Sequence, residues 1–260
     1  YDGLATATVT TADDRLAGDS VGITRSASFG SKDVVWVGNT IGGTVDSQAI
    51  SVSGVSLTGT DASNYSVSAT GAATGKITPK TLHVSGITAL DKVYDATNTA
   101  TLASLPSIST AMGKVAGDTV TFNTSSATFA SSSAGQGKIV SINATFNGAD
   151  AGNYSITYQP TTMASVLQRQ VTVSASGGVS KTYDGTTAMN GVSLSLGAVS
   201  GQAASGVISG DLANLTVSGV GSFGSANVGS SVSYTLSNLQ LSGTQASNYV
   251  ITGGVTSVSG

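Results

Sequence analysis

The chain has 260 residues, a net charge of −3 and only 9 % charged residues, so its composition does not favour nucleic acid or an anionic membrane surface as a partner. It contains no cysteine and one histidine, which leaves few ligands for a transition metal. Aspartate supplies all 13 acidic residues, and Ser and Thr together make up about 30 % of the chain. Because straight-chain helix formers are scarce and turn- and strand-forming residues dominate, we expect an all-β protein with almost no helix.

Three copies of a two-part motif divide the chain. The front part begins with Tyr-Asp and the back part is a five-residue segment that ends in Asn-Tyr. The front motifs begin at Tyr1, Tyr94 and Tyr183, and the back motifs occupy residues 61–65, 150–154 and 245–249. The front motifs are 93 and 89 residues apart, so we predict three tandem repeats of about 90 residues: repeat 1 (1–79), repeat 2 (80–168) and repeat 3 (169–260).

In repeat 2, alternating hydrophobicity predicts about seven short strands. In chain order they cover residues 81–87, 92–94, 119–122, 127–129, 138–146, 154–158 and 165–167. In segment 138–146, Val140, Ile142, Ala144 and Phe146 share one face, so we expect this strand to be half buried. Short strands with turn signals every 8–12 residues or so are typical of an immunoglobulin-like β-sandwich.

The back motif is similar to the tyrosine corner of immunoglobulin-type domains, in which a Tyr hydroxyl bonds to the backbone of a preceding loop. The matching residues are Tyr65, Tyr154 and Tyr249. Repeat 3 has Gln245 where the other repeats have Asp, but the corner depends on the Tyr. We expect Tyr154→Phe to destabilise repeat 2 without affecting its neighbours.

Repeat 1 differs from the others in two respects. It carries an insertion of about ten residues near 35–44, which contains the only Trp, Trp36, and the turn-forming Asn39, and a lengthened hairpin is its simplest interpretation. No residues precede Tyr1, so we expect its first strand to be missing and the chain to be an internal fragment, whereas repeat 3 should be nearly complete.

The segment Lys181-Thr182-Tyr183-Asp184-Gly185-Thr186-Thr187 opens repeat 3 and matches the pattern Lys-x-Tyr-Asp-Gly-Thr-Thr throughout, and residues 92–97 match it except for Ala96. These motifs resemble the YDG-type repeats of very large bacterial exoproteins, similar to filamentous haemagglutinin-like adhesins. The resemblance implies a protein that is secreted or displayed on the surface of a Gram-negative bacterium, with a role in adhesion or biofilm formation. It names no catalytic residue.

We expect no catalytic residue, no cofactor and no metal, and therefore no enzyme. The single histidine, His83, lies in an alternating strand next to a repeat boundary, where a surface position is the simpler reading. Two stabilising features stay open. Calcium could be held by Asp13, Asp14 and Asp19 or by Asp91 and Asp95, although no spacing matches a known calcium loop. An isopeptide bond could join Lys92 or Lys181 to Asn153 or Asn248.

Two functions remain in competition. Repetition and low charge favour a structural spacer whose immunoglobulin-like sandwiches lie end to end as a rod, because residues 78–80 and 167–170 leave very short junctions. The alternative is a glycan- or receptor-binding module of an adhesin, with Trp36 and Asn39 as the candidate site. The expected partners are neighbouring repeats of the same polypeptide and a host or matrix glycan or protein, without nucleic acid and without membrane insertion.

Overall fold

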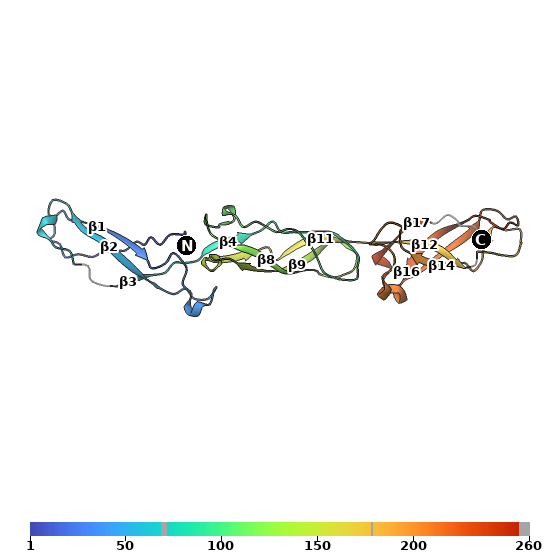
Figure 1. The fold of residues 1–260 in the computed structure, drawn as a ribbon, viewed down its shortest axis with the longest axis horizontal. Helices are drawn as coiled ribbons and strands as arrows, with labels where there is room; N and C mark the ends of the chain where they lie inside the picture. Colours follow the sequence, from blue (N-terminus) through green and yellow to red (C-terminus); the bar gives the residue numbers. More distant parts are fainter. Residues whose placement is uncertain (69–71, 178, 255–260) are drawn as a thin grey trace. The chain divides into compact units, whose positions relative to one another are not determined.

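The computed structural model describes residues 1–68, 72–177 and 179–254 (Figure 1). The described residues form seventeen β-strands and six short 3-10 helices, which confirms the expected all-β class. None of these helices has the length and apolar character needed to cross a membrane. The last residues of repeat 3, 255–260, lie outside the described residues.

The chain forms two compact units, each of which contains one terminal repeat and part of repeat 2. Unit 1 consists of Tyr1–Gly86, Leu105–Ser125 and Ala144–Gln159. Unit 2 consists of Ile87–Ser104, Ser126–Asn143 and Pro160–Gly260. Two strands have residues in both units, β8 (Thr121–Phe129) and β9 (Gly135–Asn147).

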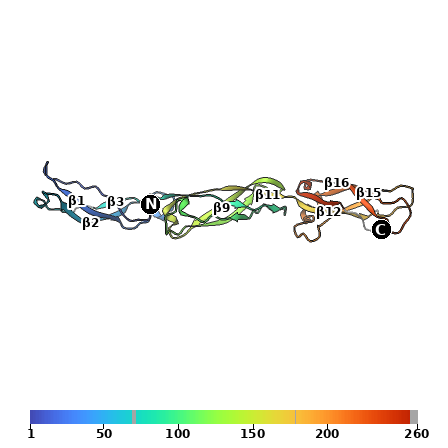
Figure 2. The same ribbon diagram turned by 90° about the horizontal axis from the view of Figure 1, so that it is seen from above.

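Unit 1 contains a three-stranded antiparallel sheet from repeat 1 (Figures 1 and 2). It also contains a two-stranded parallel sheet from repeat 2. The first has the order β1-β2-β3 and the second pairs β10 with β4. The strands are β1 (Gly22–Phe29), β2 (Gln48–Thr58), β3 (Ala73–Gly75), β4 (Lys80–Val84) and β10 (Tyr154–Tyr158). The 3-10 helices are η1 (Val37–Asn39), η2 (Ala62–Asn64), η3 (Thr110–Met112) and η4 (Ala151–Asn153).

Unit 2 contains the whole of three sheets, in the orders β5-β7, β14-β12-β17 and β13-β15-β16, and part of a fourth, β6-β11-β9-β8, because β8 and β9 have residues in both units. Its strands are β5 (Thr88–Ala89), β6 (Lys92–Val93), β7 (Leu102–Ser104), β11 (Thr161–Leu167), β12 (Arg169–Gly177), β13 (Ala188–Met189), β14 (Ser193–Gly197), β15 (Thr216–Phe223), β16 (Tyr234–Ser242) and β17 (Tyr249–Gly254). The 3-10 helices are η5 (Ser209–Asn214) and η6 (Ala246–Asn248).

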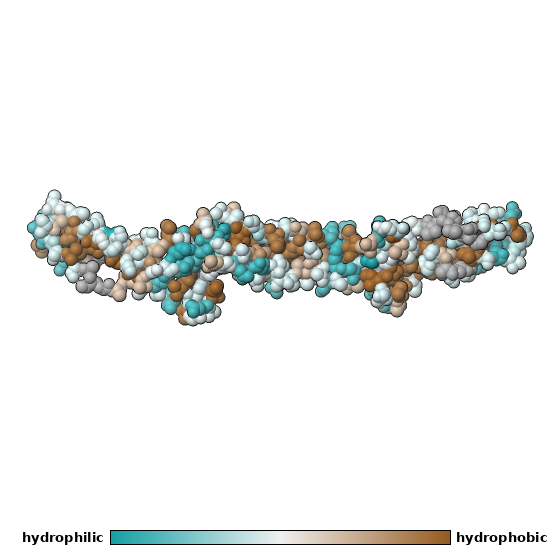
Figure 3. Space-filling model, viewed as in Figure 1, coloured by the Kyte–Doolittle hydropathy of each residue, from teal (hydrophilic) through white to brown (hydrophobic). Residues whose placement is uncertain are grey.

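In repeat 3, the two three-stranded sheets share one hydrophobic core. Val173 of β12, Met189 of β13 and Leu236 of β16 belong to the same buried cluster, so both sheets turn an apolar face towards it. On the face drawn in Figure 3, hydrophilic and hydrophobic residues are interspersed over the surface of each unit. This pattern is ordinary for small β-domains, whose surface always includes apolar atoms.

The strand predictions for repeat 2 agree with the structure in most places. β10 has the predicted bounds, and in β9 Val140 and Ile142 are buried while Ile139 is 52 % exposed, as the alternation requires. The prediction of separate strands at 119–122 and 127–129 is wrong, because β8 continues through Thr124 and Ser125. Ser and Thr are compatible with both a strand and a turn, and here cross-strand pairing decides for the strand.

A glycine with positive φ lies two residues before each corner motif. Gly59, Gly148 and Gly243 have φ values of 111°, 120° and 103°, a conformation that strongly favours glycine. A Cβ atom on Gly148 would lie 2.2 Å from the carbonyl oxygen of Thr119, and the equivalent distances at Gly59 and Gly243 are 2.2 and 2.3 Å. The corner therefore requires glycine for two reasons, namely backbone conformation and the close approach of a neighbouring loop.

We expect Gly148→Ala to lower the free energy of unfolding of unit 1 by about 3 kcal/mol, because it adds a backbone clash to the cost of a positive φ. Gly117→Ala is the matched control, since Gly117 has φ 90° but open space around the added Cβ, and it should cost about 1 kcal/mol. Urea denaturation of the two variants measures the difference. Equal losses would show that the close approach to Thr119 does not matter.

Candidate functional site: the junction between successive repeats

Each corner tyrosine binds an aspartate and a backbone amide of a loop earlier in its own repeat. The hydroxyl of Tyr154 donates to Asp118 Oδ2 at 2.6 Å and accepts from the N–H of Val115 at 2.8 Å. Tyr65 does the same with Asp19 and the N–H of Leu16, and Tyr249 with Asp211 and the N–H of Ile208. The three tyrosines thus make the backbone bond that the corner motif predicts.

The aspartate partner was not assigned from the sequence. Its signal was a Gly-Asp pair at similar places in the three repeats, Gly18-Asp19, Gly117-Asp118 and Gly210-Asp211. The pair alone indicates a turn, and only the fold brings its carboxylate to a tyrosine 46, 36 or 38 residues further along the chain.

In repeats 2 and 3, the same carboxylate also accepts a hydrogen bond from the tyrosine hydroxyl of the front motif of the preceding repeat. Tyr1 of repeat 1 donates to Asp118 Oδ2 of repeat 2 at 2.8 Å, and Tyr94 of repeat 2 donates to Asp211 Oδ2 of repeat 3 at 3.0 Å. The rings meet edge to face, with centroids 5.5 Å apart for Tyr1 and Tyr154. The centroids of Tyr94 and Tyr249 are 5.6 Å apart. The first junction lies within unit 1 and the second within unit 2.

The asparagine of the corner motif makes a second bond across each junction. Asn153 Oδ1 accepts from the backbone N–H of Val34, and Asn248 Oδ1 accepts from that of Ala134, both at 2.8 Å. These two asparagines are only 3 % and 2 % exposed, whereas Asn64 of repeat 1 is exposed. The corner asparagine is therefore buried where a preceding repeat covers it.

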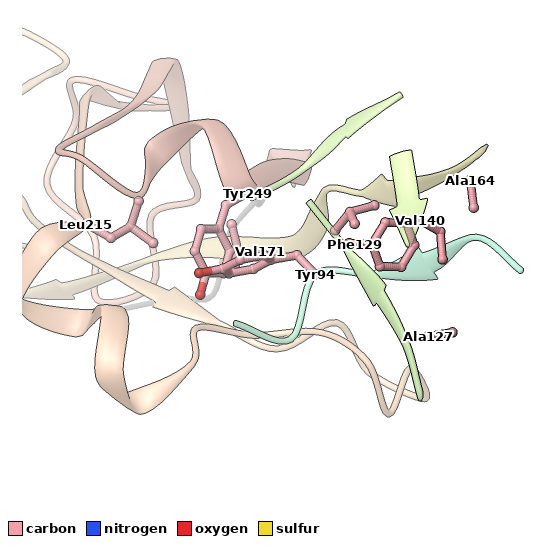
Figure 4. Close-up of a cluster of buried hydrophobic side chains, with 9 residues drawn as sticks. Tyr94, Ala127, Phe129, Val140, Ala164, Val171, Leu215 and Tyr249 are labelled. Atoms are coloured by element: carbon pink, nitrogen blue, oxygen red, sulfur yellow. The ribbon is translucent and has the colours of Figure 1, made fainter. Parts of the chain in front are cut away.

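The hydrophobic core of unit 2 continues across its junction. Figure 4 shows Tyr94 and Tyr249 beside Val171, between Leu215 of repeat 3 and Phe129 of repeat 2. All five side chains belong to one buried cluster. Repeats 2 and 3 are thus joined by a shared core as well as by hydrogen bonds.

Burial and the neighbouring carboxylates change the pKa values of the junction tyrosines. Burial, followed by the hydrogen bond to Asp118, raises the pKa of Tyr154 well above its ordinary value of 10.0. Burial and the hydrogen bond to Asp211 have the same effect on the pKa of Tyr249. The protonated hydroxyl is the form that can donate to the carboxylate, so both tyrosines are held neutral.

The first junction also carries an ion pair. Lys32 Nζ lies 2.9 Å from Asp150 Oδ1 and donates to the hydroxyl of Tyr1 at 2.9 Å. The pKa of Asp150 is lowered by its bond from the N–H of Thr119 and then by Lys32. The hydrogen bonds to Tyr1 and Asp150 raise the pKa of Lys32. This cluster is charged at neutral pH.

The candidate ligand-binding residues Trp36 and Asn39 occupy different environments. Trp36 is 9 % exposed, packs with Val34 and Ile77, and donates its indole N–H to the carbonyl of Gly152 at 2.8 Å. Asn39 is exposed, with a φ of 56°. The insertion therefore brings Trp36 into the first junction, against the corner of repeat 2, and leaves its ring little surface on which a sugar could stack.

Other residues singled out from the sequence have local partners. His83 Nδ1 is 3.0 Å from the Thr157 hydroxyl. Lys92 binds Asp95 and Lys181 binds Asp184, at 2.7 and 2.8 Å, so both lysines named for an isopeptide bond pair with an aspartate of their own front motif. Asp13 binds Arg15, and Asp91 accepts from the N–H of Ser165. Within the described ranges, no group of three or more potential metal-ligating side chains comes together.

These observations define a class of protein, namely a tandem array of β-rich repeats joined through their front and corner motifs. The chain belongs to the YDG domain family, whose model matches it twice, over residues 78–163 and 167–257. A search of curated proteins and a search of solved structures found no significant match.

We expect Tyr154→Phe to destabilise unit 1 by about 1–3 kcal/mol, because it removes a donor to a buried carboxylate and leaves the N–H of Val115 without its acceptor. The expectation that this change would act on repeat 2 alone needs correction, since Tyr1 shares Asp118 and packs on Tyr154. Hydrogen exchange should therefore increase at Val34 as well as at Val115. Tyr183→Phe is the control, since Tyr183 is 63 % exposed; equal effects of the two variants would contradict the assignment.

Stability should fall as the pH rises above 10. The pKa values of Tyr154 and Tyr249 are raised in the folded state, so above the unfolded value of 10.0 the folded chain retains protons that the unfolded chain has lost. The stabilisation is complete below pH 10 and is lost progressively at higher pH. Urea midpoints measured from pH 8 to 11.5 should decline more steeply for the parent chain than for a Tyr154→Phe/Tyr249→Phe variant. Parallel declines would exclude the two hydroxyls as the cause.

Proposed function

We propose that the chain is a structural spacer made of stalk repeats, in which successive repeats are held in a fixed relation by their junctions. The observation that carries the proposal is the recurrence of the junction. At both junctions a front-motif tyrosine binds the aspartate of the Gly-Asp pair of the next repeat, and a corner asparagine binds back to the preceding one. The residues that the repeats share are thus used to join repeats to one another.

Such junctions resist bending because bending would separate several buried contacts at once. In unit 2, it would open the core between Phe129 and Leu215 and leave Asp211 with one tyrosine donor instead of two. Repeat proteins whose neighbours share an interface behave as quasi-one-dimensional arrays. We propose that the repeats are immunoglobulin-like sandwiches arranged end to end, which the common core of the two sheets in repeat 3 supports.

We further propose that the array belongs to a secreted or surface-displayed bacterial adhesin of the filamentous haemagglutinin-like kind. There it would extend a distal binding region away from the cell and contribute to adhesion or biofilm formation without catalysing a reaction. Membership of the YDG family and the Lys181–Thr187 motif support this assignment.

Small-angle X-ray scattering tests the spacer. Three sandwiches in line should extend over about 100–120 Å and give a radius of gyration of about 30 Å or more, whereas a globule of this length would give about 18 Å. A Tyr94→Ala/Asp211→Asn variant, in which the second junction is weakened, should show a broader distribution of lengths, and Tyr183→Ala serves as its control. A value near 18 Å for the parent chain would rule out the spacer.

A glycan array separates the spacer from a glycan-binding module. The parent chain should show no reproducible binding, and Asn39→Ala should behave in the same way. Asn39 is the informative position because its side chain is exposed, whereas Trp36 is buried and its removal would disturb the fold. Reproducible glycan binding by the parent chain that is lost in Asn39→Ala would contradict the spacer and favour the glycan-binding module.

A further inference from the structure

The two junctions share their geometry but differ in charge. At the first, Lys32 lies among three carboxylates, with its Nζ atom 2.9 Å from Asp150, 3.7 Å from Asp33 and 3.8 Å from Asp118. It also lies 5.4 Å from the centre of the Tyr1 ring. One cation from repeat 1 thus compensates two corner carboxylates of repeat 2.

The second junction has a neutral residue at three of the four equivalent positions. The equivalence follows from the recurring Phe, since Lys32 is three residues after Phe29 and Ser132 is three residues after Phe129, and from the matching bonds of Val34 and Ala134 to the corner asparagine. Ser132 and Ser133 stand in place of Lys32 and Asp33, and Gln245 stands in place of Asp150.

Gln245, which takes the place of Asp150 at the second junction, has hydrogen-bond partners within that junction. Gln245 Oε1 accepts from the Asn248 amide at 2.6 Å and from the Tyr94 hydroxyl at 3.3 Å. Lys138 is close in sequence, but it donates to the Ser131 hydroxyl and to the carbonyl of Ser133. Of the four positions, only that of the aspartate that binds both tyrosines has a charged residue at both junctions, Asp118 at the first and Asp211 at the second.

We propose that these positions form a matching code that determines which repeat can follow which. A repeat with Lys at the position of Lys32 (a Lys end) pairs with a repeat whose corner motif begins with Asp, as at Asp150 (an Asp corner). A repeat with a neutral residue at that position (a neutral end) pairs with a corner motif that begins with Gln, as at Gln245 (a Gln corner). The code operates through the penalty of mismatch. An Asp corner against a neutral end leaves two neighbouring carboxylates without the cation of the preceding repeat, so that only Lys114 of their own repeat, which donates to the carbonyl of Asp118, is near them. A Lys end against a Gln corner leaves an ammonium group with one carboxylate fewer.

The code assigns a partner chemistry to the two faces that have no neighbour in the described structure. The corner of repeat 1 carries Asp61 and Asp19, so it fits the end of a YDG-type repeat with Lys at the position of Lys32. The end of repeat 3 carries Ala226, three residues after Phe223, and Asn227. It is neutral and fits a corner with Gln. Two copies of this chain are therefore mismatched head to tail.

Transplanting the charged set to the second junction tests the code. The readout is native-state hydrogen exchange at the N–H groups of Ala134 and Ile208, which donate to Asn248 and Tyr249 across and beside this junction. Gln245→Asp should reduce their protection at least about fivefold, because it places a second carboxylate near Asp211. Ser132→Lys alone should change protection less than about twofold. Adding Ser132→Lys to Gln245→Asp should raise the protection again by at least about threefold, and 1 M salt should reduce this gain in protection.

The first junction provides the reciprocal experiment, which also decides the question if Gln245→Asp does not fold. Lys32→Ser and Asp150→Gln should each reduce the protection of the N–H groups of Val34 and Val115, and the double variant should be better protected than the product of the two single effects. Lys181→Ser is the control, since Lys181 pairs with Asp184 within one repeat. Independent effects of the two substitutions at the junctions would overturn the code. This test is independent of the proposed spacer function. The scattering experiment could rule out the spacer while hydrogen exchange still showed that the charges of the two repeats must match.

Discussion

The structure depends on a carboxylate that accepts hydrogen bonds from two tyrosines of different repeats. Asp118 and Asp211 are 8 % and 6 % exposed, and a carboxylate at this depth is costly unless donors replace the lost water. The corner tyrosine of the same repeat supplies one donor and the front-motif tyrosine of the preceding repeat supplies the other. A single repeat therefore cannot complete the environment of its own aspartate.

This sharing explains why the compact units do not follow the repeats of the sequence. Unit 2 includes half of repeat 2 together with repeat 3, with one core between them. In such an array the stability of each repeat includes a term from the interface with its neighbour. Loss of a corner then affects two repeats.

Much of this arrangement follows from local sequence patterns, and the rest depends on contacts between distant residues. The alternation in β9 and the bounds of β10 could be predicted because they need only neighbours in the chain. The backbone bonds of the corner tyrosines span about 40 residues or more and could be predicted only because the motif is similar to a known corner. The roles of Tyr1 and Tyr94 could not, because their partners are 117 residues away and a Tyr-Asp motif by itself indicates only a turn. For the same reason Trp36 was assigned to a ligand site, whereas it packs against the corner of repeat 2.

The contrast between the charged and the neutral junction has a consequence for how such arrays change in length. An array of tandem repeats changes in length when a whole repeat is deleted or duplicated. Removing repeat 2 from this chain would bring the Lys32 end of repeat 1 against the Gln245 corner of repeat 3, and duplicating it would set its Ser132 end against its own Asp150 corner. Either product would keep the reading frame and the hydrophobic pattern and still contain one poorly matched junction, so selection at the protein level would act against drift in repeat number.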